Sequence, residues 1–229
     1  MRAYLTAILC CAAIAATGCA REEDALDAAV TPAPAPAPAA SAGVSGAGPA
    51  SLVLACAPPF TREATPTTLA AVFGRENVIP ETVAGPEGAQ INVTAIYPND
   101  PARRIEIIFR NEEERTDLSA VMISAPESQW TGPGGIGMGD TIADVQSANG
   151  GVFNVMGFQW DYGGFVSDWR GGRLDDVDGC RTTVRLSPAG EDLPGDIVGD
   201  GVEPASDLPA MRAAQPRVSS FGIGWAPAT

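Results

Sequence analysis

The chain of 229 residues has 14 basic and 28 acidic side chains, a formal net charge of −14 at pH 7, and no His. All of its basic residues are Arg. The acidic balance excludes nucleic acid as a partner, because nucleic-acid affinity depends on cationic contacts to phosphates. The missing His and Lys exclude Ser-His-Asp and Cys-His nucleophile systems, the usual catalytic zinc sites, Schiff-base chemistry and the P-loop. We therefore assign no catalytic residue, no metal and no cofactor from the sequence.

Residues 1–18 have the composition of a secretory signal peptide. Arg2 gives a cationic start, the stretch from Ala3 to Ala16 is almost entirely apolar, and the small residue Gly18 precedes Cys19. The apolar stretch is shorter than the roughly 20 residues that a bilayer-spanning helix needs. We therefore expect residues 1–18 to be removed during export.

The residues Ala16-Thr17-Gly18-Cys19 resemble a lipobox, the motif that lipoprotein signal peptidase cleaves before a lipid-modified Cys. Gly18 and Cys19 match the motif, whereas Ala16 stands where that family usually has Leu. The resemblance implies that Cys19 is lipidated and attaches the chain to a membrane. Ala20, in place of Asp, implies sorting to the outer membrane, facing the periplasm. The alternative is an ordinary signal peptide and release of the protein without an anchor.

The segment 19–50 is predicted to be a disordered tether. Pro occupies every second position from Pro32 to Pro38, which fixes φ and removes backbone donors, and Ser41 to Ala50 consists mostly of small residues. About 30 residues at roughly 3.1 Å each, when extended, would place a domain up to ~90 Å from the membrane.

Cys56 and Cys180 are the two cysteines beyond the N-terminal region. An isolated pair in an oxidising compartment is typical of a disulfide, so export makes this the favoured interpretation. Two buried free thiols are the alternative. The bond would connect the start of the folded region to a segment near its predicted end.

Residues 51–186 are predicted to form one α+β domain. Thr65 can cap a helix that begins at Pro66 and ends at Gly74. A second helix is predicted between Asp140 and Gly150, where the spacing resembles a capping box. The pattern of apolar residues predicts strands at 91–97, 104–110, 118–124, 152–160, 164–170 and 181–186.

The order of these elements indicates two units, each a helix followed by antiparallel strands, that share one sheet. The stretch Gly137–Val145, with the Asn149-Gly150 stop that follows it, resembles the β-lactamase-inhibitor-protein-like fold. The same unit occurs in small lipoproteins of the outer-membrane β-barrel assembly machinery. The resemblance covers about Thr65 to Leu186 and implies a non-enzymatic role in protein binding or envelope assembly.

Residues 187–229 are rich in Pro, Gly and acidic residues and are predicted to form a mostly irregular tail. A helical turn is expected within Asp207–Ala214. A final strand at 218–225 is expected to return to the sheet.

Some loops match part of a dinucleotide-binding or calcium-binding motif but lack the rest of the motif or the structural elements that should surround it. Gly132–Gly137 has the spacing GxGxxG, but Pro133 lies within it and no βαβ unit surrounds it, so a Gly-rich loop is the favoured interpretation. The acidic segments 175–179 and 196–203 lack the full calcium-loop spacing and are interpreted as solvent-facing turns.

The aromatic stretch Gly157–Gly164 and its neighbours supply the candidate binding surface. Aromatic rings beside a carboxylate are typical of carbohydrate-binding or protein-binding sites. The candidates are Trp130, Asp161, Tyr162, Asp168 and Trp169. In the alternative, strand alternation places Phe158 and Trp160 together in the core and leaves Tyr162 and Trp169 as the exposed residues.

Asp161 and Asp168 flank a predicted hairpin, which is the best available arrangement for a glycosidase-like carboxylate pair. Acidic residues are so plentiful that such pairs arise by chance. We therefore favour a non-catalytic envelope lipoprotein that contacts the membrane through its lipid and binds an envelope protein. A cell-wall glycan-binding or glycan-cleaving protein is the alternative.

Overall fold

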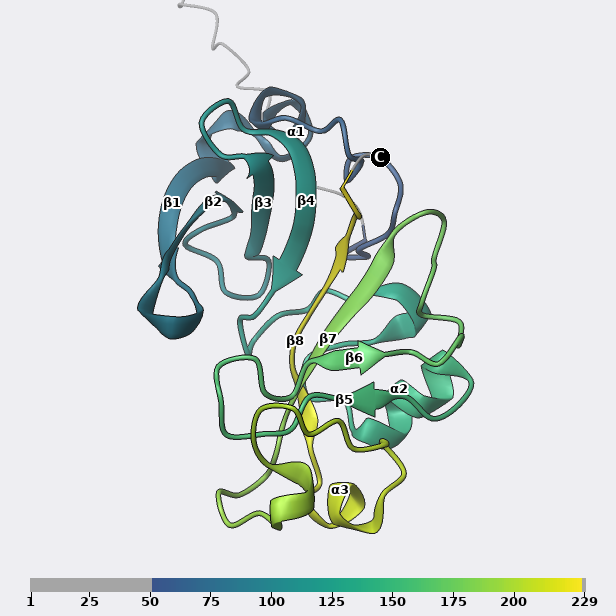
Figure 1. Ribbon diagram of the computed structural model, residues 1–229. Helices are drawn as coiled ribbons and strands as arrows, with labels where there is room; N and C mark the ends of the chain where they lie inside the picture. The colour runs from purple at the N-terminus through teal and green to yellow at the C-terminus, as the bar shows by residue number, and fades with distance from the viewer. Residues whose placement is uncertain (1–50, 228–229) are drawn as a thin grey trace, which may run out of the picture. The chain divides into compact units, whose positions relative to one another are not determined.

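The computed structural model describes residues 51–227, so the predicted signal peptide, Cys19 and the whole predicted tether lie outside the described residues. The described part is α+β, as expected, with a six-stranded antiparallel sheet and few helices (Figure 1). Short 3₁₀ turns lie at Arg75–Asn77, Pro86–Gly88, Pro133–Gly135 and Gly195–Ile197.

The first helix, α1 (Pro66–Phe73), begins and ends where the sequence predicts. The hydroxyl of Thr65 accepts a hydrogen bond from the backbone N–H of Thr68, and the Thr68 hydroxyl accepts one from the N–H of Thr65. This reciprocal pair satisfies two donors at the helix start. Leu69 and Phe73 are fully buried, so the helix packs on the domain through this face.

Four strands follow as an antiparallel meander: β1 (Val78–Ala84), β2 (Gln90–Ile96), β3 (Ile105–Asn111) and β4 (Thr116–Ile123). The last three confirm the predicted strands. The sequence missed β1, because Pro80 interrupts its pattern. A Pro is tolerated here since β1 is an edge strand, where a missing N–H leaves no gap in a ladder.

The second helix, α2 (Ile142–Asn149), is also confirmed with its caps. Thr141 and Asp144 form the reciprocal cap, and Gly150 has the left-handed conformation with φ of 83° that ends many helices. Of the expected second set of strands, the one at 181–186 is confirmed in the main sheet, whereas the two before it are not. A short separate ribbon of β5 (Asn154–Val155) and β6 (Val166–Asp168) forms in their place, so the repeat of the first unit is not confirmed.

The predicted long strands at 152–160 and 164–170 are therefore wrong. The backbone of the first of these segments bonds to the irregular segment 197–206: the N–H groups of Val155, Gly157 and Phe158 donate to carbonyls of Pro204, Val202 and Ile197. These bonds satisfy its buried backbone without a regular ladder.

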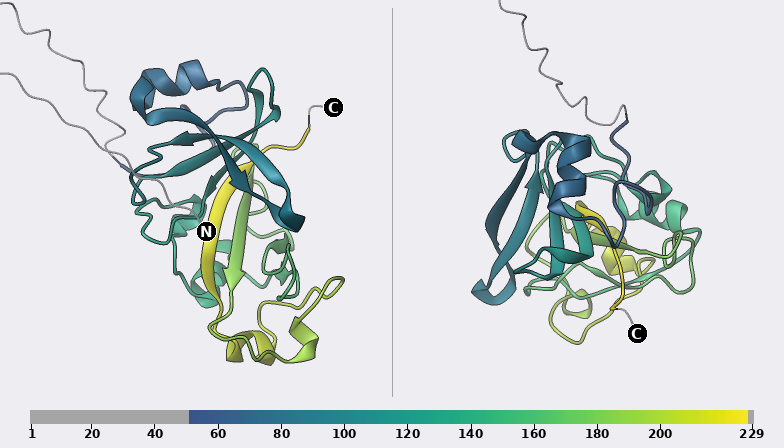
Figure 2. Two further views of the ribbon diagram at one scale, coloured as in Figure 1. Left: turned by 90° about the vertical axis from the view of Figure 1, so that its left-hand side faces the viewer. Right: turned by 90° about the horizontal axis from the view of Figure 1, so that it is seen from above.

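The C-terminal region after Leu186 contributes a strand to the sheet, as expected. After β7 (Arg181–Ser187) and α3 (Pro209–Ala213), the strand β8 (Arg217–Gly224) pairs with β4 on one side and β7 on the other. Figure 2 shows β8 and β7 running side by side. The expected helical turn and final strand are confirmed. The strand order is β1-β2-β3-β4-β8-β7.

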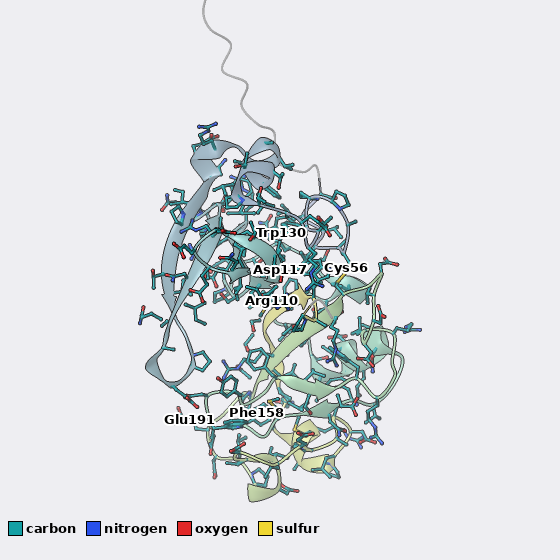
Figure 3. The ribbon with its side chains drawn as sticks, turned by 45° about the horizontal axis from the view of Figure 1, so that its top comes forward. Cys56, Arg110, Asp117, Trp130, Phe158 and Glu191 are labelled. Carbon is teal, nitrogen blue, oxygen red and sulfur yellow. A yellow bond between two sulfur atoms is a disulfide. The ribbon has the colours of Figure 1, made fainter. Side chains whose placement is uncertain are left out.

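One face of this sheet carries the core. Phe221 and Ile223 of β8 are fully buried there with side chains from β3, β4 and β7. Cys56 and Cys180 form the predicted disulfide, with a sequence separation of 124 and a Cα–Cα distance of 6.1 Å. The bond joins the segment before α1 to the start of β7, and Cys56 lies in the same half of the domain as Trp130 (Figure 3).

Candidate binding groove

The sheet face opposite the core is apolar rather than polar over its central strands. On β3, Ile105 and Ile107 are fully buried in the core, whereas Ile108, which follows Ile107, faces the other way. Ile108 lies opposite Ala120 of β4, and Met122 follows two residues later on the same face. A solvent-facing sheet surface normally carries polar side chains at such positions, so this face is expected to be covered or to bind something apolar.

A groove of about 740 Å³ lies on this face. Its floor is formed by β2, β3, β4, β7 and β8, and its walls by the end of the β1–β2 hairpin and by the loop 156–165. Residues with large apolar or aromatic side chains predominate in its lining: Val83, Ile91, Val93, Ile108, Met122, Met156, Trp160, Tyr162 and Phe165.

Gly164 holds the loop wall against β7. Its carbonyl accepts a hydrogen bond of 2.8 Å from the N–H of Leu186, and its φ is +85°. A Cβ at this position would lie 2.0 Å from the carbonyl oxygen of Leu186. Only Gly combines this conformation with so close an approach to another strand.

The two walls touch at one point of the rim. The backbone N–H of Glu87, at the tip of the β1–β2 hairpin, donates a 2.8 Å hydrogen bond to Oδ2 of Asp161 in the loop wall. We call this bond the rim contact. It joins residues 74 positions apart in the sequence.

At the β3 side of the groove the carboxylate of Glu106 shares one cation with a second carboxylate. Arg104 donates to Glu81 at 2.7 Å and to Glu106, a groove residue, at 3.0 Å. The hydrogen bond to Glu81 is the main cause that raises the pKa of Arg104; burial opposes it and Glu106 adds to it. One guanidinium serves two carboxylates, so this cluster of three side chains keeps one net negative charge at the β3 side of the groove.

At the β7 side the groove contains one cation, Arg185. Its Nε donates to the carbonyl of Gly163 at 2.8 Å and its Nη2 to the carbonyl of Asp161 at 3.0 Å, and the guanidinium lies 5.0 Å from the ring centre of Phe165. No carboxylate among residues 51–227 forms an ion pair with it.

Two of the five predicted surface residues, Trp130 and Trp169, are core residues, so their assignment to a binding surface is wrong. Their side chains are 1% and 2% exposed. Each indole N–H has a buried partner: Trp130 donates to the carbonyl of Arg103, and Trp169 donates to that of Thr182, both at 2.9 Å. A large ring with a satisfied polar atom is well suited to a core.

Tyr162 and Asp161 do lie at the surface, as predicted, and both line the groove. The ring of Tyr162 lies 5.4 Å from that of Trp160. The alternative that placed Phe158 and Trp160 together in the core holds only for Phe158. Gln159 between them has a φ of 66°, so the segment is no regular strand and Trp160 turns toward the groove.

Asp168 lies apart from the groove lining. It belongs to β6, is exposed, and accepts a hydrogen bond from the N–H of Arg170 at 2.7 Å. The groove therefore contains Asp161 without its predicted carboxylate partner. The hypothesis of a glycosidase-like pair gains no support from this arrangement.

The remaining sequence motifs form loops. Gly134 and Gly135 line a shallow pocket together with Asp140 and Asp144, whose carboxylates disfavour a phosphate there. In the acidic segment 175–179, the side chain of Asp176 accepts the N–H of Gly179 at 3.0 Å, which closes a turn. Within residues 51–227 no three Cys, Asp or Glu side chains gather in a way that would hold a metal ion.

No protein-family model, curated protein or solved structure matches this chain. Within residues 51–227, none of the helices has the length and apolar character needed to cross a bilayer. The fold and the groove together define an α+β domain whose sheet has a buried core on one face and an open apolar groove on the other.

Proposed function

We propose that this chain is an exported envelope lipoprotein, anchored through Cys19, whose domain is a non-catalytic binding module. The signal-like residues 1–18 and the lipobox-like residues before Cys19 support export and anchoring. The disulfide between Cys56 and Cys180 supports an oxidising compartment, because such bonds are rare in the cytosol.

The groove is the observation that carries the binding role. Ligand pockets typically enclose about 300–1,000 Å³ and combine an apolar lining with a few polar groups, and this groove does both. Met122 and Met156 on its surface can adapt to ligands of different shape, since their side chains are flexible and polarisable. The ligand of the groove is therefore expected to present a large apolar part.

The test is a titration of the folded protein with the uncharged fluorescent probe N-phenyl-1-naphthylamine. We expect saturable binding to the wild type and loss of binding in Ala120→Phe, because Ala120 lies on the groove floor and a ring there fills it. The matched control is Ala143→Phe, on the exposed face of α2, which should bind as the wild type does. Equal binding by both variants would contradict the proposal.

Glycan binding is the second candidate, favoured by one observation. Trp160 and Tyr162 lie side by side next to Asp161, an arrangement that can stack on a sugar ring. Soluble peptidoglycan fragments added to the same titration separate the two functions. Displacement of the probe by the fragments would favour glycan binding, whereas unchanged probe binding favours the apolar ligand.

A further inference from the structure

The two sides of the groove differ in chemistry. Over β2, β3 and β4 the floor is mostly apolar, with Val93, Ile108 and Met122 in its lining beside Glu106. Over β7 and β8 the floor carries Thr183 and Arg185, two positions apart on one strand, with Ser220 directly opposite Arg185 on the next. We call these three residues the polar end.

The polar end has hydrogen-bonding capacity that the described residues do not use. Arg185 uses Nε and Nη2 to hold the loop wall, while its Nη1 makes no hydrogen bond to any described residue. The hydroxyls of Thr183 and Ser220 likewise make none within residues 51–227. A guanidinium that has no ion-pair partner among residues 51–227 and keeps one nitrogen free of hydrogen bonds, flanked by two hydroxyls, complements an anion.

The floor favours an alkyl chain over a peptide as the apolar part of the ligand. Strands β3, β4 and β8 are paired on both sides, so their backbone groups are already used within the sheet. A peptide lying on this floor would bury N–H and C=O groups without partners, which is unfavourable. An alkyl chain has no such groups.

We infer that the groove binds a single-chain amphiphile of the fatty-acid class, with its alkyl chain over β2–β4 and its carboxylate on Arg185. This rests on the proposed function, which it deepens by naming the ligand class. Because the whole chain carries a net charge of −14, non-specific attraction favours cations. A preference for the anion therefore has to come from a local group, and Arg185 is the cation that lines the groove.

The test compares three probes with the same alkyl chain: laurate, 1-dodecanol and dodecylammonium, each below its micelle concentration. Isothermal titration of the wild type should give the tightest binding for laurate. Arg185→Gln should weaken laurate binding by roughly tenfold or more and dodecanol binding much less, since laurate alone loses a charge-assisted bond whereas both lose the support that Arg185 gives the loop wall. Arg185→Lys should recover part of the loss.

The matched control is Arg181→Gln, on the same strand but exposed, paired with Asp175 and away from the groove lining. It should bind laurate like the wild type. If Arg185→Gln does not fold, the order of the three probes on the wild type decides alone.

Equal affinity of the wild type for laurate and dodecanol would overturn the inference while the proposed function stands. A library of short apolar peptides with free C-terminal carboxylates serves as the peptide probe. If these peptides bind more tightly than laurate, the inference is overturned in favour of a peptide ligand. No binding of any of these probes, with no difference between the wild type and Ala120→Phe, would overturn both.

Discussion

The backbone N–H of Glu87 lies 2.8 Å from Oδ2 of Asp161 and joins the two walls of the groove at its rim. Glu87 has a φ of 56°, a conformation that non-Gly residues adopt infrequently, and it is exposed. The tip of the β1–β2 hairpin makes this rim contact with the loop that carries Trp160 and Tyr162. Movement of either segment therefore changes access to the groove.

The rim contact predicts a difference between two substitutions of Asp161. Asp161→Ala removes the acceptor and should speed amide hydrogen exchange at Glu87 roughly fivefold, because a net hydrogen bond contributes about 1 kcal/mol. Asp161→Asn keeps a carbonyl acceptor and serves as the control, with exchange close to the wild type. Identical exchange at Glu87 in both variants would mean that the bond does not hold the rim in solution.

The disulfide is predicted to be a large contributor to stability. For the sequence separation of 124 between Cys56 and Cys180, the chain-entropy model gives about 4–5 kcal/mol. The double variant Cys56→Ser/Cys180→Ser should lose stability of this order in urea unfolding. A reducing agent should produce the same loss in the wild type and none in the double variant. Equal unfolding midpoints for oxidised and reduced wild type would contradict the prediction.

The N-terminal cap of α2 is predicted to cause part of the loss of folding stability at low pH. The hydroxyl and backbone N–H of Thr141 both donate to Oδ2 of Asp144, at 2.6 and 2.9 Å, and these hydrogen bonds lower the pKa of Asp144 below its usual 3.8. A lowered pKa in the folded state means that the stabilisation is complete above about pH 4 and is lost as pH falls through the folded value.

Asp144→Asn should therefore show a smaller drop in melting temperature between pH 6 and pH 3 than the wild type. Asp192→Asn is the control, since the exposed Asp192 makes no side-chain hydrogen bond within the described residues. A drop in Asp144→Asn as large as in the wild type would show that the cap does not titrate in this range.

If Cys19 is lipidated, the mature protein has a defined N-terminal residue and a defined increase in mass. Protein recovered from the membrane fraction of cells that export it should begin at Cys19 and carry acyl groups there, as measured by intact-mass spectrometry. Cys19→Ser should shift the protein out of the membrane fraction. An unmodified chain that retains Met1 would contradict both the export and the anchor.

The sequence predicted those elements whose determinants are local. Thr65 and Thr141 each precede a helix that they cap, and the alternation within 104–110 corresponds to β3. The Cys56–Cys180 bond followed from the number of cysteines and the expected compartment. In each case a few neighbouring residues, or one chemical constraint, determine the outcome.

The sequence did not predict the elements that depend on distant partners. The segment 152–160 has the residues of a strand, yet the carbonyls of Pro204 and Val202 satisfy its backbone. Trp169 lies next to polar residues in sequence and is buried because Phe153 and Thr182 meet it from other segments. Packing of this kind overrides local preference.

The groove could have been inferred in part from one unused signal. In β3 and β4 apolar residues occupy both faces: Ile107 faces the core while Ile108 faces away, and Val121 faces the core while Met122 faces away. A strand that is apolar on both faces indicates that each face of the sheet is covered by other parts of the protein or by a ligand. Arg185 had no such signal, because its role follows from the loop that lies over it.

The most direct test of the groove uses the methionines that remain after signal removal. Met122 and Met156 line the groove, whereas Met211 is fully buried in the core and Met138 packs beside it. In the ¹³C-methyl NMR spectrum of Met-labelled protein, N-phenyl-1-naphthylamine should shift the signals of Met122 and Met156 and leave the other two unchanged. Saturable binding that shifts Met138 or Met211 alone, or that shifts no Met signal, would contradict the assignment of the groove as the binding site.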